Sequence, residues 1–322
     1  MRRKLMTRSM QRRKSNLRTR LSSLRVTQSI AVFGTRALVL TCALVSFHVE
    51  AKLPSKPPVE RAQAQEPQLP RDLRVPGGIA VLQVAPASAP KPSVTRDGVS
   101  IWVKQGATHW WAVVGLPLSI TPGPHSVAVA ATPMAAAQTI HFDVKPKRYP
   151  VQKLTLNKAM VDPPAEVIER IERESAHLKT VRSRWRETDA TNAAFVIPAK
   201  GRLSSRFGVA RVLNGQPRAP HAGLDVAIPT GTPITAPGDG IVLDVGDYYY
   251  CGKSLYIDHG NGLLTLYCHL SEHIAKVGDA VKQHQLVALS GGTGRATGPH
   301  LHWTVYLNGV SVEPELFLST KQ

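Results

Sequence analysis

The chain of 322 residues is short of acidic, aromatic and cysteine residues, and each shortage limits what the protein can be. Acidic residues are absent from the first 36 positions, which carry eleven Lys or Arg and lead into the apolar run Ala37–Val49. That run has 13 residues, fewer than the about 20 that a membrane-spanning helix needs, and this pattern is typical of a secretory signal. We therefore expect residues 1–51 to be a signal peptide or an N-terminal anchor, and the protein to be exported to the periplasm or cell envelope.

Two other interpretations of this leader stay open. Cleavage after a small residue could fall at Val49–Ala51, but an uncleaved membrane anchor could instead begin at Ile30 and tolerate Arg36. Arg12 and Arg13 could form a twin-arginine signal, although the apolar pair that usually follows is missing.

The excess of basic residues is concentrated in the leader. Removing its eleven basic residues from the total of 40 leaves 29 against 22 acidic residues, a net charge of +7. A mildly basic protein suits an anionic wall polymer or a membrane surface. Aromatic residues make up 6% of the chain, and no nucleic-acid motif or basic-aromatic stripe is present, so nucleic acid is not an expected partner.

Of the three cysteines, Cys251 and Cys268 would remain after removal of the leader. Residues 258–262, Asp-His-Gly-Asn-Gly, predict a hairpin turn between two β-rich runs, and this register places the two cysteines nearly opposite each other. A cross-strand disulfide and two buried free thiols are both compatible with the sequence. We expect His259, in that turn, to lie at the surface, as do His273 and His284 in polar stretches.

Composition divides the chain after the leader into four segments. Six prolines among Gln, Ala and Lys indicate an extended linker at 52–76. Short β-like runs separated by turn signals predict a small β-sandwich at 77–150. A helix that starts at Asp162–Pro164 predicts a helical connector at 151–194, with Trp185 on its apolar face. Glycine-punctuated β-runs, including one at Val277, predict a mainly antiparallel β domain at 195–322.

The β-sandwich contains no cluster of reactive side chains. Its tryptophans, Trp102, Trp110 and Trp111, could form a binding face, but such aromatics more often belong to the core. We therefore expect the catalytic residues to lie in the C-terminal domain.

Two short segments of that domain carry metal-ligand residues. His221 and Asp225 lie in P-H-A-G-L-D-V, and His300 and His302 lie in G-P-H-L-H-W. Residues i and i+4 of a strand share a face but lie about 13 Å apart, so His221 and Asp225 can converge only if the segment bends, most easily at Gly223. Imidazole and carboxylate are the ligands of a catalytic zinc that keeps one position open for water.

The domain resembles the lysostaphin-type zinc endopeptidases of bacterial peptidoglycan over residues 201–318. The resemblance rests on a series of motifs in order: G-R-L-S-S-R-F-G (201–208), H-A-G-L-D (221–225), A-P-G-D-G-I-V (236–242), I-D-H-G-N-G-L (257–263), Y-C-H-L (267–270), V-G-D-A-V-K (277–282) and T-G-P-H-L-H (297–302). It implies an antiparallel β-sheet with a groove across one face.

The resemblance also implies roles for individual residues. His221, Asp225 and His302 would bind one zinc ion, and His269 and His300 would be catalytic histidines that do not bind the metal. Which of these two acts as the general base stays open. More weakly, Asn214 and Arg206 would line the substrate groove.

We therefore expect a zinc metalloendopeptidase that binds the peptide stems of bacterial peptidoglycan and hydrolyses the peptide cross-links between them. The alternative is a non-catalytic protein that binds the wall or activates another hydrolase, but all five site positions are filled here. A peptidase of this fold that acts on another secreted peptide also fits. The upstream β-domain and helix could cover the groove until a partner moves them.

Overall fold

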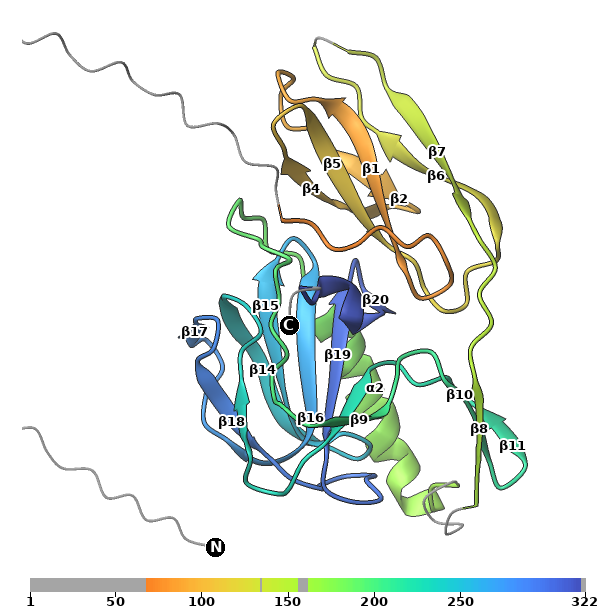
Figure 1. Cartoon of the computed structure of the whole chain (residues 1–322), viewed down its shortest axis with the longest axis vertical. Coiled ribbons are helices and arrows are strands. Elements are labelled where there is room, and N and C mark those ends of the chain that lie inside the picture. Colours follow the sequence, from red (N-terminus) through yellow and green to blue (C-terminus); the bar gives the residue numbers. More distant parts are fainter. Residues whose placement is uncertain (1–67, 134, 156–161, 320–322) are drawn as a thin grey trace, which may run out of the picture. The chain divides into compact units, whose positions relative to one another are not determined.

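The computed structural model describes residues 68–133, 135–155 and 162–319 (Figure 1), so the predicted leader lies outside the described residues. The described chain is mainly β, as the sequence predicts. Within these ranges, no helix has the length and apolar character needed to cross a membrane.

The first part of the chain folds into two small antiparallel sheets. One has the order β1-β5-β4, and the other has the order β3-β2-β6-β7. Their bounds are β1 Ile79–Pro86, β2 Val94–Arg96, β3 Val99–Ser100, β4 Trp102–Gln105, β5 His109–Gly115, β6 Gly123–Val129 and β7 Gln138–Val144. Buried side chains from both sheets form one cluster, which confirms the predicted β-sandwich.

The tryptophans of this sandwich divide between core and surface. Trp102 is 1% exposed and Trp110 is 9% exposed, so both belong to the core. Trp111 follows Trp110 on β5 and is partly exposed, because successive side chains of a strand point to opposite faces of the sheet. Two of the three tryptophans, Trp102 and Trp110, therefore belong to the core, as predicted.

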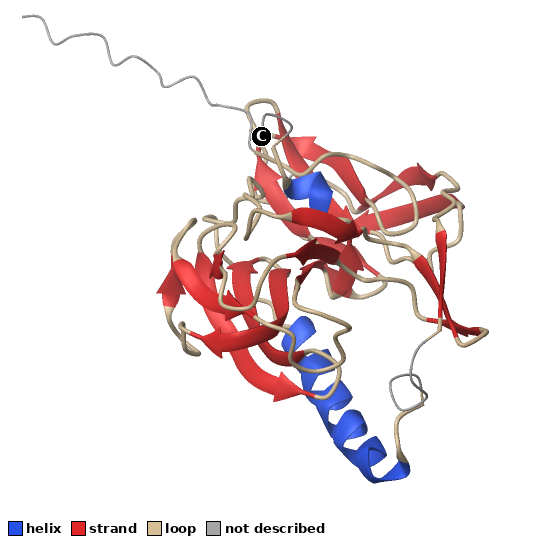
Figure 2. Ribbon diagram, turned by 60° about the horizontal axis from the view of Figure 1, so that its bottom comes forward, coloured by secondary structure: helices blue, strands red, loops and turns tan. Residues whose placement is uncertain are grey.

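The predicted connector contains a short strand, β8 (Val151–Leu154), and a helix, α2 (Ile168–Arg182), preceded by a 3-10 turn, η1 (Ala165–Val167). Asp162 does not cap the helix, because its carboxylate accepts a hydrogen bond from Arg218 and the helix starts later than predicted. Trp185 lies beyond the end of the helix. Figure 2 shows α2 as a long helix beside the strands, and it packs on β14 (Gly240–Tyr248).

The C-terminal domain is built around a 10-stranded sheet. Its main path runs β17-β14-β15-β16-β19-β12-β9, with β13, β18 and β20 paired to the side. The bounds of its remaining strands are β9 Arg202–Ser205, β12 Leu224–Ala227, β13 Pro233–Thr235, β15 Gly252–Gly260, β16 Leu263–His273, β17 Ala280–Val281, β18 Leu286–Ser290, β19 Leu301–Leu307 and β20 Val310–Val312. The short turn η2 (Pro314–Phe317) follows.

Alternation along the central strands gives this sheet two different faces. In β19, Leu301, Trp303 and Val305 are fully buried in the main core. Tyr306 of the same strand packs with Val181 of α2 on the opposite face. His302, Thr304 and Tyr306 are alternate residues of β19, so their side chains point to the same face of the sheet, the face that carries α2.

The start of the described chain differs from the predicted linker. Leu69 and Leu73 pack against the main core, and Val75 is 8% exposed. The backbone N–H of Arg71 donates to the carbonyl of Leu316 at 3.0 Å. Residues 69–75 are therefore packed against the protein, although their composition resembles the linker before them.

Two other expectations were wrong. Val277 is 61% exposed and lies outside the strands, because β17 begins only at Ala280. His259, expected at the surface, is 3% exposed. Its Nδ1–H donates to the carbonyl of Asp239 at 2.7 Å, and its Nε2 lies 2.9 Å from Oγ1 of Thr265. The turn itself is Asn261-Gly262, with positive φ at both residues, so His259 falls inside β15.

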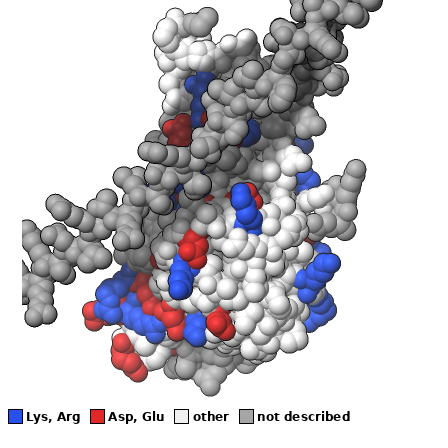
Figure 3. Space-filling model, turned by 90° about the vertical axis from the view of Figure 1, so that its left-hand side faces the viewer, with Lys and Arg blue, Asp and Glu red and all other residues white. Residues whose placement is uncertain are grey.

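Charged side chains do not form a single basic patch on the face shown in Figure 3, where Lys and Arg lie beside Asp and Glu. Three ion pairs of this kind are Lys91–Glu187, Arg173–Glu169 and Lys282–Asp239. Exposed pairs of this type contribute little to stability.

The buried His259 predicts a pH dependence of stability. Burial lowers its pKa from 6.5 to about 4. Between these values the unfolded chain binds a proton that the folded chain does not, so the free energy of unfolding falls as the pH falls from 7 towards 4. We expect His259→Asn to reduce the loss between pH 7 and pH 5 by about 2 kcal/mol in urea denaturation. His284→Asn, at an exposed position, is the control; equal pH slopes for the wild type and His259→Asn would contradict the account.

Candidate active site

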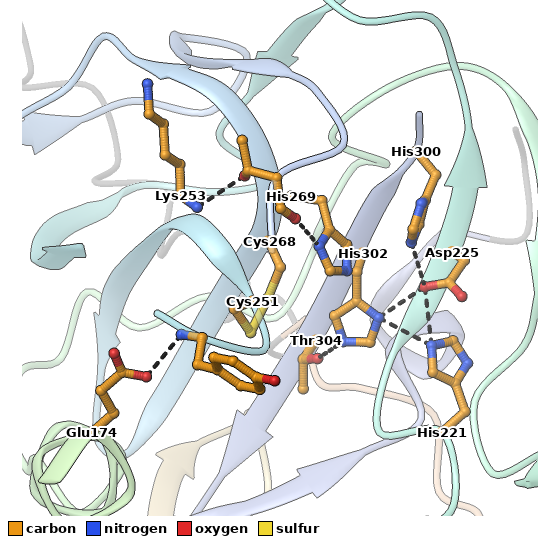
Figure 4. The surroundings of a disulfide bond; sticks show 12 residues. Glu174, His221, Asp225, Cys251, Lys253, Cys268, His269, His300, His302 and Thr304 are labelled. Atoms are coloured by element: carbon orange, nitrogen blue, oxygen red, sulfur yellow. Dashed lines mark hydrogen bonds and ion pairs between the residues drawn. A yellow bond between two sulfur atoms is a disulfide. The ribbon is translucent and has the colours of Figure 1, made fainter. Parts of the chain in front are cut away.

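Three side chains from separate strands and loops converge on one point of the α2 face of the sheet. Nε2 of His221 lies 3.0 Å from Oδ1 of Asp225 and 3.0 Å from Nδ1 of His302. Nδ1 of His302 lies 2.8 Å from the same carboxylate oxygen. Ligands of a tetrahedral zinc ion at about 2.0–2.1 Å lie about 3.4 Å apart, so a slight separation of these atoms would admit an ion. The donor set fits a metal site (Figure 4).

The register of two strands produces this convergence. Asp225 of β12 pairs directly with His302 of β19, and directly paired residues point to the same face. Leu224 and Val226, on either side of Asp225, are fully buried in the main core. The alternation that buries the leucine and valine therefore presents the carboxylate to the other face.

His221 reaches the site from the loop before β12. Its backbone N–H donates to the carbonyl of Val209 at 2.9 Å, and its carbonyl accepts from Gly208 at 2.8 Å. A Cβ atom at Gly223 would lie 2.7 Å from Cε1 of His302 and 2.5 Å from the carbonyl oxygen of Trp303. The segment bends so that the side chains of His221 and Asp225 meet. Position 223 must be a glycine, because any side chain there would collide with β19.

The outer nitrogens of both imidazoles are held by the protein. Nδ1–H of His221 donates to the carbonyl of Arg206 at 2.8 Å, with Oγ of Ser205 at 3.1 Å. Nε2 of His302 lies 2.9 Å from Oγ1 of Thr304. Because the carbonyl fixes the proton of His221 on Nδ1, the lone pair of Nε2 faces the site.

The protonation of these groups favours metal binding. Burial alone would raise the pKa of Asp225, but its close contacts with His221 and His302 outweigh burial and hold the pKa well below its usual range. Burial lowers the pKa of His302, and Asp225 only partly opposes this effect. At neutral pH the site therefore offers an ionised carboxylate and a neutral imidazole, the forms that bind metals.

His269 joins the site through an unusual backbone conformation. Its neighbour Tyr267 lies in the main core, and regular alternation would send His269 to the same face. Instead His269 has φ +62°, and its ring centroid lies 6.2 Å from that of His302. A positive φ is rare for residues other than glycine and is often found at functional sites.

His269 and His300 lie beside each other at the candidate metal site, with ring centroids 4.6 Å apart. Nδ1–H of His269 donates to the carbonyl of Thr293, and Nδ1–H of His300 donates to the carbonyl of Gly298, both at 2.8 Å. Nε2 of His300 lies 3.9 Å from Oδ1 of Asp225. Burial lowers the pKa of His269 to about 4, so this ring is neutral at pH 7 with an unprotonated Nε2.

The residue that precedes His269 in the chain, Cys268, forms a disulfide bond. Cys251 and Cys268 are bonded to each other, which resolves the two alternatives left by the sequence. The backbone N–H of His269 donates to the carbonyl of Cys251 at 2.7 Å. Cys268 pairs with His302 across the strands, so the bond ties the segment of His269 to the register that positions His302.

Asp225, His269, His300 and His302 line a pocket of about 120 Å³. One wall is formed by Leu213 of β10 (Ala210–Leu213) and Leu154 of β8, two strands that pair in parallel. The segment that follows the β-sandwich thus contributes to the wall of the pocket. Two arginines that sequence reasoning missed, Arg211 and Arg295, also line it.

The prediction that Arg206 and Asn214 line the substrate groove stays a prediction, since neither residue lines the pocket of about 120 Å³. Arg206 forms an ion pair with Glu315 and lines a neighbouring pocket, beside Tyr149 and Phe207. Asn214 has φ +50° in the turn between β10 and β11 (Gln216–Arg218). The carbonyl of Arg206 nevertheless orients His221, by accepting a hydrogen bond from its Nδ1–H.

Both domains of the chain match known protein families. Residues 73–147 match the N-terminal domain of peptidase family M23, and residues 219–314 match peptidase family M23 itself. A crystal structure described as a peptidase M23 from Pseudomonas aeruginosa is 36% identical, covers 76% of this chain and 95% of that chain, and has a TM-score of 0.65. The chain belongs to peptidase family M23.

Two curated relatives of this M23 peptidase carry more specific descriptions. The peptidoglycan DD-endopeptidase ShyA of Vibrio cholerae is 42% identical over 116 residues, which are 36% of this chain and 27% of ShyA. The DD-carboxypeptidase/endopeptidase Mpg of Neisseria meningitidis is 42% identical over 94 residues, 29% of this chain and 22% of Mpg. The matched region therefore spans about a quarter of the length of these relatives.

The geometry predicts which histidines hold the metal. We expect His302→Ala to lose bound divalent metal, because only two of the three ligand groups remain. His284→Ala, an exposed histidine of the same domain, should retain metal at the wild-type level. Metal content of the purified proteins by mass spectrometry of the element measures both. Full metal occupancy in His302→Ala would contradict the assigned site.

Proposed function

We propose that the chain is a zinc-dependent endopeptidase that hydrolyses peptide cross-links of bacterial peptidoglycan. The observation that carries this proposal is the convergence of His221, Asp225 and His302, together with His269 and His300, which line the same pocket as Asp225 and His302. The relatives described as peptidoglycan DD-endopeptidases support the substrate.

In this proposal His221, Asp225 and His302 hold one zinc ion. When bound, zinc supplies a water with a pKa near 7 and polarises a carbonyl group. The carboxylate of Asp225 would offset part of the charge of the ion, and a site of two imidazoles and one carboxylate would keep a position open for water.

His269 and His300 carry the proton transfers. Each donates Nδ1–H to a backbone carbonyl, so each can present Nε2 to the pocket. One Nε2 takes the proton of the attacking water, and the other stabilises the oxyanion or protonates the leaving amine. Both rings are fixed by the backbone before substrate arrives, which reduces the cost of orienting them.

We also propose that the chain is exported and acts in the periplasm or cell envelope, either freed from its leader or anchored by it. The basic and apolar leader supports this, and so does a substrate found outside the cytoplasm. Recovery of the active chain from the cytoplasmic fraction with residues 1–51 intact would contradict export.

The alternative, a non-catalytic protein that binds the wall or activates another hydrolase, is less well supported. Such a protein needs neither the three ligand groups nor the two oriented histidines. All five side chains are present here: Asp225, His269, His300 and His302 line one pocket, and Nε2 of His221 lies 3.0 Å from Oδ1 of Asp225.

Digestion of purified peptidoglycan sacculi tests the proposal. The zinc-loaded protein should release fragments whose masses match cleavage within peptide cross-links, and a chelator should abolish this release. His269→Ala should keep its metal but lose about 100-fold or more in rate. His284→Ala is the matched control and should behave as wild type.

Cleavage that persists in the presence of chelator would contradict a metal-dependent mechanism. Wild-type turnover in His269→Ala would overturn the role assigned to that residue.

A further inference from the structure

β16 contains a β-bulge at His269. Leu255 of β15 pairs with Tyr267, and Lys253 pairs with Leu270, so one residue of β15 lies opposite two residues of β16. The second of these two residues is His269, whose φ is +62°. A bulge places an extra residue in one strand and changes the direction in which its side chain points. The bulge therefore explains how the ring of His269 reaches the candidate metal site.

The backbone of this bulge is attached to the turn between β14 and β15. Cys251 lies in that turn, and its disulfide bond joins it to Cys268, the residue before His269. The carbonyl of Cys251 accepts a hydrogen bond from the backbone N–H of His269 at 2.7 Å. A residue other than glycine keeps a positive φ only where the surrounding structure holds it. Here one covalent bond and one hydrogen bond hold two consecutive residues of the bulge.

The same turn supports the group that orients the ring of His269. The carbonyl of Thr293 accepts a hydrogen bond from Nδ1–H of His269 at 2.8 Å. Oγ1 of Thr293 accepts from the backbone N–H of Lys253 at 2.9 Å. A Cβ atom at Gly252 would lie 2.3 Å from the carbonyl carbon of Thr293, so the two segments are in direct contact. Residues 251–253 therefore position both the backbone of His269 and the acceptor of its ring.

Other contacts of the turn do not replace the disulfide (Figure 4). The backbone N–H of Tyr249 donates to the carboxylate of Glu174 at 2.8 Å, which ties the turn to α2. This contact does not reach His269. Cys268 is fully buried between α2 and the sheet, and Cys251 is partly exposed beside it. The bond is therefore the covalent link between the turn and the bulge.

We infer that the Cys251–Cys268 disulfide is a positioning element that holds His269 in the conformation needed for proton transfer. The inference rests on the proposed function for the role of His269. A disulfide that only stabilised the fold would not affect turnover at temperatures where the protein is fully folded, whereas a positioning disulfide would. Because disulfides persist in oxidising compartments and are reduced in the cytoplasm, the inference also links turnover to the proposed export.

The metal ligands depend on other contacts. Asp225 and His302 are set opposite each other by the pairing of β12 with β19, and buried side chains on the other face fix that pairing. We therefore expect loss of the disulfide to lower kcat and to leave the zinc content and KM close to the wild-type values.

Cys251→Ser tests the inference with little disturbance of the core, because Cys251 is partly exposed and Cys268 keeps its place. For hydrolysis of a soluble cross-linked stem peptide by the zinc-loaded protein, we expect kcat to fall about 10- to 100-fold. In a His269→Ala background the same substitution should cause little further loss, because the group that the disulfide positions is gone.

Val281→Ala is the matched control, because Val281 is buried in the main core on β17, away from the turn. It should lower the thermal stability and keep the wild-type kcat. A phosphine reductant should reproduce the loss of kcat in the wild type and have no effect on Cys251→Ser. The phosphine becomes its oxide, water supplies the oxygen and two protons, and the disulfide becomes two thiols. Reoxidation should restore kcat.

Hydrogen exchange of the His269 amide, followed by NMR, gives a readout that does not require activity. Its protection should fall in Cys251→Ser, whereas the amide of Leu264, at the other end of β16, should keep the wild-type protection.

Three results would overturn the inference and leave the proposed function standing: wild-type kcat in folded Cys251→Ser, loss of zinc from that variant, or an undiminished further loss in the His269→Ala background. An oxidised, zinc-loaded wild type that cleaves neither the peptide nor sacculi would overturn the proposed function. Unchanged protection of the His269 amide in Cys251→Ser would then overturn the positioning role as well, and lost protection would support it.

Discussion

The antiparallel pairing of β12 with β19 sets Asp225 opposite His302, and the rest of the site is arranged around that pair. The pairing is fixed by the core, because Leu224, Val226, Leu301 and Trp303 are all buried on the other face. A slip of one residue would bury the carboxylate and expose the leucine, so hydrophobic burial enforces the register that the chemistry needs. The site therefore depends on the stability of the core behind it.

Much of this arrangement could be predicted from the sequence. The turn signals and β-rich runs predicted a β-sandwich and a larger antiparallel sheet, and the structure has both. The spacing of His221 and Asp225 required a bend near Gly223, and their side chains do meet. Gly223 was expected because a glycine bends easily, but the structure shows a steric reason: a Cβ atom at position 223 would collide with His302.

The rest depends on contacts between distant segments, which local patterns do not reveal. His259 looked like a turn residue, but the turn starts at Asn261, and the ring is buried against Phe195 with centroids 4.7 Å apart. Arg211 sits on a short strand whose parallel partner, β8, lies about sixty residues earlier in the chain. The packed residues 69–75 likewise gain their contacts from η2 and the main core, at the far end of the chain.

The central claim is that two imidazoles and one carboxylate surround a single ion. X-ray absorption spectroscopy at the zinc edge of the metal-loaded protein tests this most directly. We expect only nitrogen and oxygen neighbours at about 2.0–2.1 Å, with the outer-shell pattern of two imidazole rings. Sulfur at about 2.3 Å, or a shell without imidazole, would contradict the account.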